Sequence, residues 1–188
     1  MARAPRKPHG ATLAFAAITI EGALIAPAML ARIAEQKAVG QSDADYNIPK
    51  GLTLRDEVAR YFRIGQALFK ELFATATPST AATTRFVEAL LRDVFGFADI
   101  SRAGVHMLGE RLYPVTLEAH GGRVPVVVVP PSDEIDAVSL HLPSEGRRRS
   151  AASALQDWLN AGEGALWGFC SNALFSALVA PALERAVG

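Results

Sequence analysis

Three consecutive arginines are the residues of this sequence best placed to do chemistry. The run 147–149 directly precedes a segment that Ser150 or Ser153 could cap as a helix. Guanidinium groups and helix N-termini both attract phosphate, because each presents N–H donors and positive charge. Gln156 follows one helical turn later and could support the same contact. The alternative is a solvated loop, since charge runs commonly mark exposed segments. We predict a contact with DNA phosphate, or with an acidic face of another domain, at Arg147, Arg148, Arg149 and Gln156.

The composition bounds the remaining chemistry. Of the 188 residues, 19 are Lys or Arg and 19 are Asp or Glu, so no global charge marks a nucleic-acid binder. Half of the chain is apolar, which suits a soluble globular protein with a core. The single cysteine, Cys170, excludes an internal disulfide and a multi-cysteine zinc site, and its apolar context predicts an inert buried thiol. The histidines show no metal-ligand spacing; they are His9, His106, His120 and His141.

Apolar periodicity predicts helices ahead of the arginine run. Over residues 54–74 apolar side chains recur at helical spacing, and Thr53 suits the N-cap position. A second helix is predicted over 81–95, ended by Gly96. The short polar link between these two helices is typical of an antiparallel pair. A shorter helix is predicted to begin at Pro27.

Beyond Gly96 the apolar pattern changes and predicts strands. A run of valines bounded by prolines suits a buried strand. A helix capped by one of the two serines is predicted to extend to Asn160. Trp158 and Trp167 lie in apolar periodic contexts, so we expect them in the core rather than as base-stacking platforms. The predicted strands cover residues 112–118, 124–129 and 165–170.

The first thirty residues carry a conflicting signal. Residues 1–10 are polar and basic, and we expect them to be disordered. They precede two uncharged stretches, 10–20 and 22–31, in a pattern that resembles a secretory signal. Neither stretch reaches the roughly 20 apolar residues that a membrane span needs, and Glu21 separates them. We therefore predict buried core here, with a membrane-associated or secreted protein as the alternative.

Three phrases of the sequence point to a family. YNIPKGLTLRDEVARYFRIGQALFKEL spans 46–72, FVEALLRDVFGF spans 86–97, and GRRRSAASALQDWLNAGEGALWGFCSN spans 146–172. Together they resemble the N-terminal region of large adenine-specific DNA methyltransferases. These are the single-chain type IIG restriction-modification enzymes and the related methylases of DISARM and BREX phage-defence systems. The resemblance covers about residues 12–172, and its last phrase has the arginine run, the LQDWLN helix and the LWGFCSN strand in family order.

The end of the sequence departs from that family. Family members continue past the Ser-Asn pair with Gly and a Leu/Arg-rich strand that leads to the methylase domain. Here the chain reads ALFSALVAPALERAVG from Ala173. We therefore expect 173–188 to be a divergent tail, or the product of a truncated, frameshifted or split gene. The alternative is a genuine short helix, since Ala, Leu and Glu are good helix formers.

The resemblance implies S-adenosylmethionine as the cofactor of a full-length family member, but the chain lacks the motifs for it. An adenine methylase needs a Gly-rich turn after a strand, and an Asn/Asp-Pro-Pro-Tyr/Phe loop to hold the flipped base. The Pro130–Pro131 pair is flanked instead by Val129 and Ser132. GEGALWG, at 162–168, precedes a strand rather than following one. We expect no cofactor and no methyl transfer in this chain alone.

The family also implies a nuclease core, with helix-strand-strand-helix-strand order, at the front of type IIG enzymes. Such a core needs an Asp after one strand and Glu-x-Lys on the next, so that the carboxylates hold Mg²⁺. No lysine follows Lys70, so the Glu-x-Lys element is missing. We predict that the acids flanking the second strand are solvated, with an active Mg²⁺ nuclease as the alternative. These acids are Glu118, Asp133, Glu134 and Asp136.

Together these patterns predict an α+β fold in which N-terminal helices pack on a small mixed sheet with a degenerate restriction-nuclease-like core. The expected organisation is a basic start (1–10), an accessory domain (11–172) and the tail (173–188). The expected function is that of a DNA-engaging N-terminal fragment of an adenine-N6 methyltransferase from a restriction-modification or phage-defence system. Its expected partners are the DNA backbone and a methylase domain, in the cytoplasm and without a membrane or a bound metal.

Overall fold

The computed structural model of the protein describes residues 25–103, 106–108, 110–143, 148–162 and 164–181. The chain divides into two compact units, residues 1–58 and 59–188. Helix α1 (Pro27–Ala34) begins at Pro27 as predicted, but none of its side chains is buried. The expectation of buried core is therefore wrong for this part of the segment, and residues 10–24 lie outside the described chain. No helix in the described ranges is long and apolar enough to cross a membrane.

Helix α2 (Leu54–Leu72) confirms the strongest helix prediction. Just before it lies a 3₁₀ turn, η1 (Asp43–Asp45). Thr53 caps the helix: its Oγ1 accepts a 3.3 Å hydrogen bond from the backbone N–H of Asp56. The Asp56 carboxylate in turn accepts bonds from the backbone N–H and the hydroxyl of Thr53, at 2.9 and 2.7 Å. These bonds satisfy donors that the first turn of a helix leaves open.

The second predicted helix is present, but it changes from an α-helix to a π-helix near its end. Helix α3 (Thr80–Ala89) is capped by Ser79, whose Oγ accepts from the N–H of Ala82. It continues as a π-helical turn, η2 (Leu90–Val94). Gly96, with φ of 74°, then ends the helical segment in a left-handed conformation that glycine adopts without strain.

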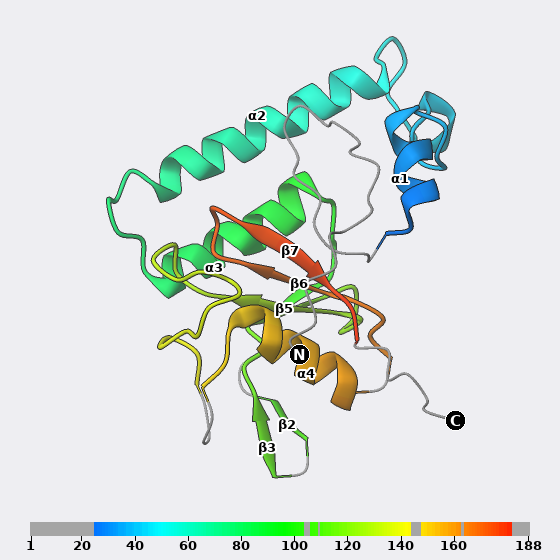
Figure 1. The fold of residues 1–188 in the computed structure, drawn as a ribbon. Coiled ribbons are helices and arrows are strands. Elements are labelled where there is room, and N and C mark those ends of the chain that lie inside the picture. The colour runs from blue at the N-terminus through cyan, green and yellow to red at the C-terminus, as the bar shows by residue number, and fades with distance from the viewer. Residues whose placement is uncertain (1–24, 104–105, 109, 144–147, 163, 182–188) are drawn as a thin grey trace, which may run out of the picture. The chain divides into compact units, whose positions relative to one another are not determined.

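The second unit is organised around a five-stranded mixed sheet (Figure 1). In the order β1-β4-β5-β6-β7, all neighbouring strands are antiparallel except β5 and β6, which are parallel. Helix α4 (Ala151–Ala161) lies in the crossover between those two strands. A separate antiparallel hairpin is formed by β2 (His106–Leu108) and β3 (Arg111–Tyr113). The sheet strands are β1 (Ile100–Arg102), β4 (Leu117–Ala119), β5 (Val124–Val128), β6 (Gly168–Ser171) and β7 (Ser176–Val179).

Strand β5 separates two hydrophobic cores. Successive side chains of a strand point to opposite faces, so alternate residues of the valine run enter different cores. Helix α3 covers one face of the sheet and α4 covers the other (Figure 1). A strand buried on both faces reads as a continuous apolar run, which confirms the prediction for this segment. The first core includes Val124, Val126, Val128, Phe86 and Val87, and the second includes Val127, Val129, Leu155, Leu159 and Cys170.

Several sequence-based expectations are corrected by the sheet. The predicted strand 112–118 is two strands, β3 and β4, that pair in different sheets. The helix considered for the tail is wrong over Ser176–Val179, which pairs with β6 as strand β7. The side chain of Asn172 accepts bonds from the N–H groups of Leu174 and Phe175, and this turn reverses the chain. Trp167 is 36% exposed and lies outside the core, whereas Cys170 is buried as predicted.

Two glycines should respond in opposite ways to the addition of a methyl group. A Cβ on Gly168 would meet Leu155 Cδ1 at 2.7 Å and the Pro125 carbonyl oxygen at 2.8 Å, so β6 and α4 could not keep their spacing. We expect Gly168→Ala to lower the free energy of unfolding by at least about 2 kcal/mol through overpacking. On Gly65, within α2, the nearest atoms lie 3.7 and 3.9 Å away. Gly65→Ala should raise stability by up to about 1 kcal/mol through helix propensity.

Urea unfolding followed by circular dichroism measures both changes. Equal stabilities of the Gly168→Ala variant and the unaltered protein would contradict the close approach of β6 and α4.

Candidate functional site

The predicted site residues differ in whether they form an ion pair within the described chain. Arg147 lies outside the described residues. Arg148 is exposed and has no ion-pair partner within the described chain. Arg149 is engaged, because its Nη1 lies 2.8 Å from Oδ2 of Asp157 and its side chain is only 23% exposed. Of the described arginines in the run, Arg148 is therefore the one available to an outside phosphate.

The start of α4 is capped from within. Ser150 is buried, and its Oγ accepts a 3.0 Å bond from the N–H of Ser153. The same hydroxyl donates to Ser153 Oγ at 2.9 Å. This confirms Ser150 as the N-cap residue. Gln156 is exposed on the helix that follows, as its predicted role requires.

The hairpin β2–β3 is fastened to α4 beside the arginines. The Trp158 ring contacts His106 and Tyr113, with ring centroids 4.9 and 5.4 Å apart. Nη2 of Arg111, in the hairpin, lies 3.2 Å from the same Asp157 oxygen that pairs with Arg149. Trp158 thus packs half-buried against the hairpin, and it belongs to neither of the two hydrophobic cores in which it was expected. The Asp157 carboxylate holds the hairpin and the start of α4 together.

A polar cluster gathers in the loop after β5. The carboxylate of Asp133 accepts a hydrogen bond from the Ser132 hydroxyl at 3.1 Å, and a very short one from the Ser139 hydroxyl. It also lies 2.9 Å from Nδ1 of His141, a half-exposed ring. Burial opposes ionisation of Asp133, but the bonds from Ser139, His141 and Ser132 outweigh it and lower the pKa of the carboxyl below its ordinary value of 3.8. Asp133 is therefore ionised at neutral pH.

Backbone and side-chain bonds attach this loop to the neighbouring elements. Buried Asn172, at the end of β6, donates through Nδ2 to the Asp133 carbonyl oxygen at 2.7 Å. The N–H of Ser139 donates to the Arg149 carbonyl oxygen at 3.0 Å. These bonds place the loop beside the residues that lead into α4. We call residues 139–141 and 148–150 the arginine stem, because they are joined at the Ser139–Arg149 bond.

The acids considered as metal ligands do not converge. Glu118, on β4, lies opposite Pro125 at the beginning of β5, whereas Asp133 follows the end of that strand. Extended chain rises about 3.3 Å per residue, so roughly 13 Å of strand separates the two ends. Oε1 of Glu118 lies instead 3.2 Å from Nε2 of His106. Within the described residues no group of three or more His, Cys, Asp and Glu could hold a metal ion.

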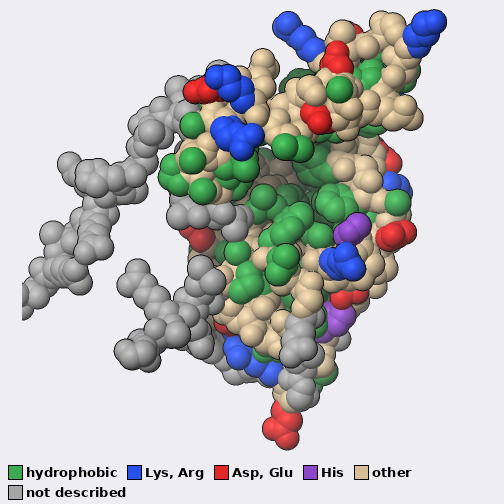
Figure 2. Space-filling model, turned by 90° about the vertical axis from the view of Figure 1, so that its right-hand side faces the viewer, with side chains coloured by type: hydrophobic (Ala, Val, Ile, Leu, Met, Phe, Trp, Pro, Cys, Tyr) green, Lys and Arg blue, Asp and Glu red, His purple; other side chains and the backbone are tan. Residues whose placement is uncertain are grey.

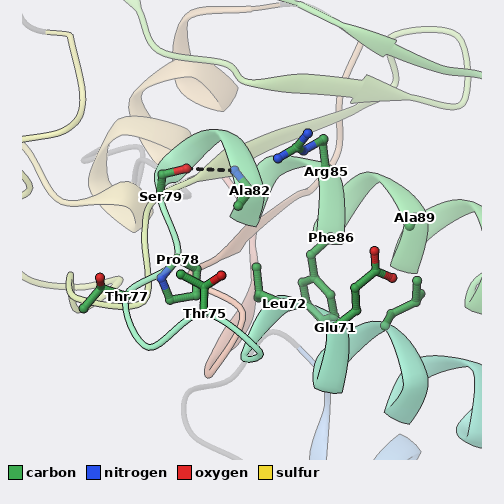
Figure 3. A pocket seen from close by; sticks show the side chains of 11 residues that line it. Glu71, Leu72, Thr75, Thr77, Pro78, Ser79, Ala82, Arg85, Phe86 and Ala89 are labelled. Atoms are coloured by element: carbon green, nitrogen blue, oxygen red, sulfur yellow. Dashed lines mark hydrogen bonds between the residues drawn. The ribbon is translucent and has the colours of Figure 1, made fainter.

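A groove of about 620 Å³ lies at the end of α2, where it meets α3 (Figure 3). Its floor is apolar and includes Leu72 and Phe86, which belong to the first core. Glu71 of α2 and Arg85 of α3 line it, and neither forms an ion pair with a described residue. One charge of each sign over an apolar floor suits an amphipathic chain better than a phosphate. This groove is therefore separate in chemistry from the arginine stem.

Basic side chains do not form a continuous stripe on the face of the protein drawn in Figure 2, where Lys and Arg alternate with acids. This distribution agrees with the equal numbers of basic and acidic residues. On this face an anion would therefore be held by local groups rather than by the field of the whole face.

Comparison with known proteins identifies no relative of this chain. No protein-family model matches the chain, and searches of curated proteins and of solved structures find no match. The resemblance to adenine methylases therefore remains an expectation from the sequence phrases.

The cluster of Asp133, Ser139 and His141 was not predicted from the sequence. Asp133 was considered only as a possible metal ligand, and His141 only as one of several scattered histidines. The three residues lie in an irregular loop, where no periodicity indicates which side chains meet. A possible signal was the Pro-Pro pair followed by Ser-Asp, which marks a turn directly after a buried strand.

Replacing Asp133 by asparagine tests how much this cluster contributes to the free energy of unfolding. Bonds to a charged group contribute about 1.5–3 kcal/mol each, and the amide keeps only part of them, so we expect a loss of about 1–3 kcal/mol at pH 7. A lowered carboxyl pKa stabilises the fold above pH 3.8 and ceases to do so as pH falls through the folded-state value. The stability gap between the two proteins should therefore narrow below about pH 4.

Urea unfolding across this pH range measures the gap. Asp136→Asn is the matched control, because Asp136 is exposed in the same loop, and it should change stability by no more than about 0.5 kcal/mol. A gap that stays constant down to acid pH would contradict the assigned role of the Asp133 charge.

Proposed function

We propose that this chain is a DNA-engaging accessory domain of an adenine-N6 DNA methyltransferase from a bacterial restriction-modification or phage-defence system. In this role it contacts the phosphate backbone through the arginine stem and accompanies a methylase domain that binds S-adenosylmethionine. Arg148 is the principal phosphate ligand, and Gln156 supports it from α4. The sequence phrases at 46–72, 86–97 and 146–172 supply the family expectation.

The observation that carries the proposal is Arg148, which is exposed at the start of α4 and has no ion-pair partner among the described residues. The nearby Arg149 and Arg111 are instead paired within the domain, because both contact Oδ2 of Asp157. Arg148 has no such partner among the described residues. A guanidinium next to the positive end of a helix supports binding of a phosphate oxygen. Gln156 can add a neutral hydrogen bond to the same backbone.

The surroundings predict that this binding is weak and independent of sequence. Glu134 and Asp136 are exposed in the loop that lies against the start of α4, where the N–H of Ala152 donates to the Ile135 carbonyl oxygen. Their negative charge opposes that of Arg148. The same arrangement suits a second role, in which Arg148 pairs with an acid on the accompanying methylase domain.

We further propose that the sheet is a restriction-nuclease-like core that has lost its metal site. The support is topological: α3, the three antiparallel strands β1, β4 and β5, the crossover helix α4 and the parallel strand β6 occur in this order, with the hairpin β2–β3 inserted between β1 and β4. In this reading β5 would carry the Glu-x-Lys element, but it reads VPVVV and all of its residues are buried. The fold would then serve as a scaffold, with its loops engaging DNA.

Arg148→Gln tests the phosphate contact. Each phosphate contact contributes about −0.9 to the slope of log K against log salt concentration. We expect this substitution to flatten the slope for a short duplex by up to about 0.9, with unfolding free energy changed by no more than about 0.5 kcal/mol. Fluorescence anisotropy at several salt concentrations measures the slope.

Arg85→Gln is the matched control, because Arg85 is an exposed arginine without an ion-pair partner in the described chain. It should leave the slope unchanged. Equal affinities and slopes for the Arg148→Gln variant and the unaltered protein would exclude the phosphate role, and would favour docking to another domain.

The loss of the metal site has its own test. With Mg²⁺ or Mn²⁺ present, the protein should leave plasmid DNA intact, because Glu118 and Asp133 lie at opposite ends of β5. Gel electrophoresis of the plasmid after incubation checks this. Cleavage that disappears in Glu118→Ala or Asp136→Ala, with circular dichroism unchanged, would show that these carboxylates act together after all.

A further inference from the structure

Strand β7 forms one edge of the five-stranded sheet (Figure 1). It pairs with β6 on its inner side, and no strand in the described ranges pairs with its outer side. An edge strand presents a row of N–H and C=O groups with which another extended chain can pair. Native proteins block such edges with charged side chains, with proline, with bulges or with a covering element. The residues of β7 therefore decide whether this edge is blocked or open.

The register of β7 determines which of its backbone groups face outward. The N–H of Asn172 donates to the carbonyl oxygen of Phe175 at 3.1 Å, so these two residues form a hydrogen-bonded pair. Hydrogen-bonded and non-hydrogen-bonded pairs alternate along an antiparallel ladder. Ala177 therefore bonds to β6, whereas Ser176 and Leu178 occupy non-hydrogen-bonded pairs. The N–H and C=O groups of Ser176 and Leu178 consequently point to the open side of the strand.

The two edges of the sheet differ in charge. At the opposite edge, strand β1 follows Asp99 and ends at Arg102, whose Nη2 lies 3.1 Å from Oε2 of Glu88. By contrast, no acidic or basic residue and no histidine occurs in the sequence between Glu163 and Glu184, which includes the whole of β7. Strand β1 thus carries the charges that discourage pairing with another strand, and β7 carries none.

Apolar side chains accompany the open edge. Leu174, Phe175 and Leu178 are between 48% and 66% exposed. An uncharged apolar segment on a sheet edge pairs readily with another strand of the same kind. The chain itself supplies such a strand, and its 19 basic and 19 acidic residues leave no net charge that would keep two copies apart. A second copy of the chain is therefore the partner that this edge fits.

We propose that β7 is the interface of a symmetric dimer, in which the β7 strands of two copies pair antiparallel and join the two sheets into one. In this two-fold arrangement Ser176 of each copy lies opposite Leu178 of the other, and each such pair exchanges two backbone hydrogen bonds. Ala177 then lies at the axis, where its small side chain permits the Cα separation of about 4.5 Å of a non-hydrogen-bonded pair. This inference is independent of the proposed function, because the arginine stem takes no part in the pairing.

Sedimentation velocity at increasing protein concentration tests the dimer. The unaltered protein should shift from monomer to dimer as its concentration rises through the micromolar range. Leu178→Lys keeps every backbone donor but adds a charge to the edge, and a two-fold contact brings two such charges together. We expect this substitution to raise the dissociation constant of the dimer at least about tenfold. A protein that remains monomeric throughout, or a folded Leu178→Lys variant with an unchanged dissociation constant, would overturn the proposal.

Ser101→Lys is the matched control, because Ser101 is exposed on β1 at the opposite edge of the sheet. It adds the same charge to an edge strand and should leave the dissociation constant unchanged. Circular dichroism checks that both variants keep the secondary structure of the unaltered protein.

Amide hydrogen exchange followed by NMR distinguishes strand pairing from other association, and it needs only the unaltered protein. The amide protons of Ser176 and Leu178 should exchange more slowly as the protein concentration rises, because the second copy covers them. The amide proton of Ala177 is already bonded to β6 and should change less. Exchange rates of Ser176 and Leu178 that are the same at low and high concentration would overturn the pairing through β7, even if a dimer forms.

Discussion

The parallel pairing of β5 with β6 is the constraint on which the rest of the second unit depends. Two parallel neighbours need a crossover connection, and α4 supplies it on one face of the sheet while α3 covers the other. Strand β5 is consequently buried on both faces, and only apolar residues can occupy it without a large desolvation cost. The close approach of Gly168 to Leu155 is a further consequence, because α4 packs directly on β6.

The same pairing decides where polar chemistry can occur. Since the strand interiors are apolar, polar groups collect at the carboxyl ends of β5 and β6. There Asn172 holds the loop of Asp133, and that loop holds the start of α4. Binding residues on such a loop are positioned by a rigid scaffold rather than by their own segment. The position of Arg148 is therefore set by bonds among its neighbours, and the Asp157 carboxylate supports the same region from α4.

Electrostatics limits what this arrangement can do. The chain has no excess of basic residues, and the acids near the stem oppose Arg148. In the function proposed above, one exposed arginine suits an accessory contact that adds to the affinity of a larger assembly. Glu118 and Asp133, which flank β5 in the sequence, are separated by the length of that strand. Flanking positions in a strand are distant in space, because the strand between them is extended.

The sequence by itself determined the elements whose signal is local. Helical periodicity with Thr53 as a cap, a second cap at Ser150 or Ser153, the buried valine run and the buried Cys170 were all predicted, because caps, periodicity and apolar runs act within a few residues. Only the tertiary structure decided the pairing of β1, β2 and β7, the exposure of Trp167, the pairing of Arg149 with Asp157 and the assembly of Asp133, Ser139 and His141. These depend on contacts between segments far apart in the chain or within irregular loops. There the identity of the neighbour, rather than any repeat in the sequence, determines whether a side chain is free or engaged.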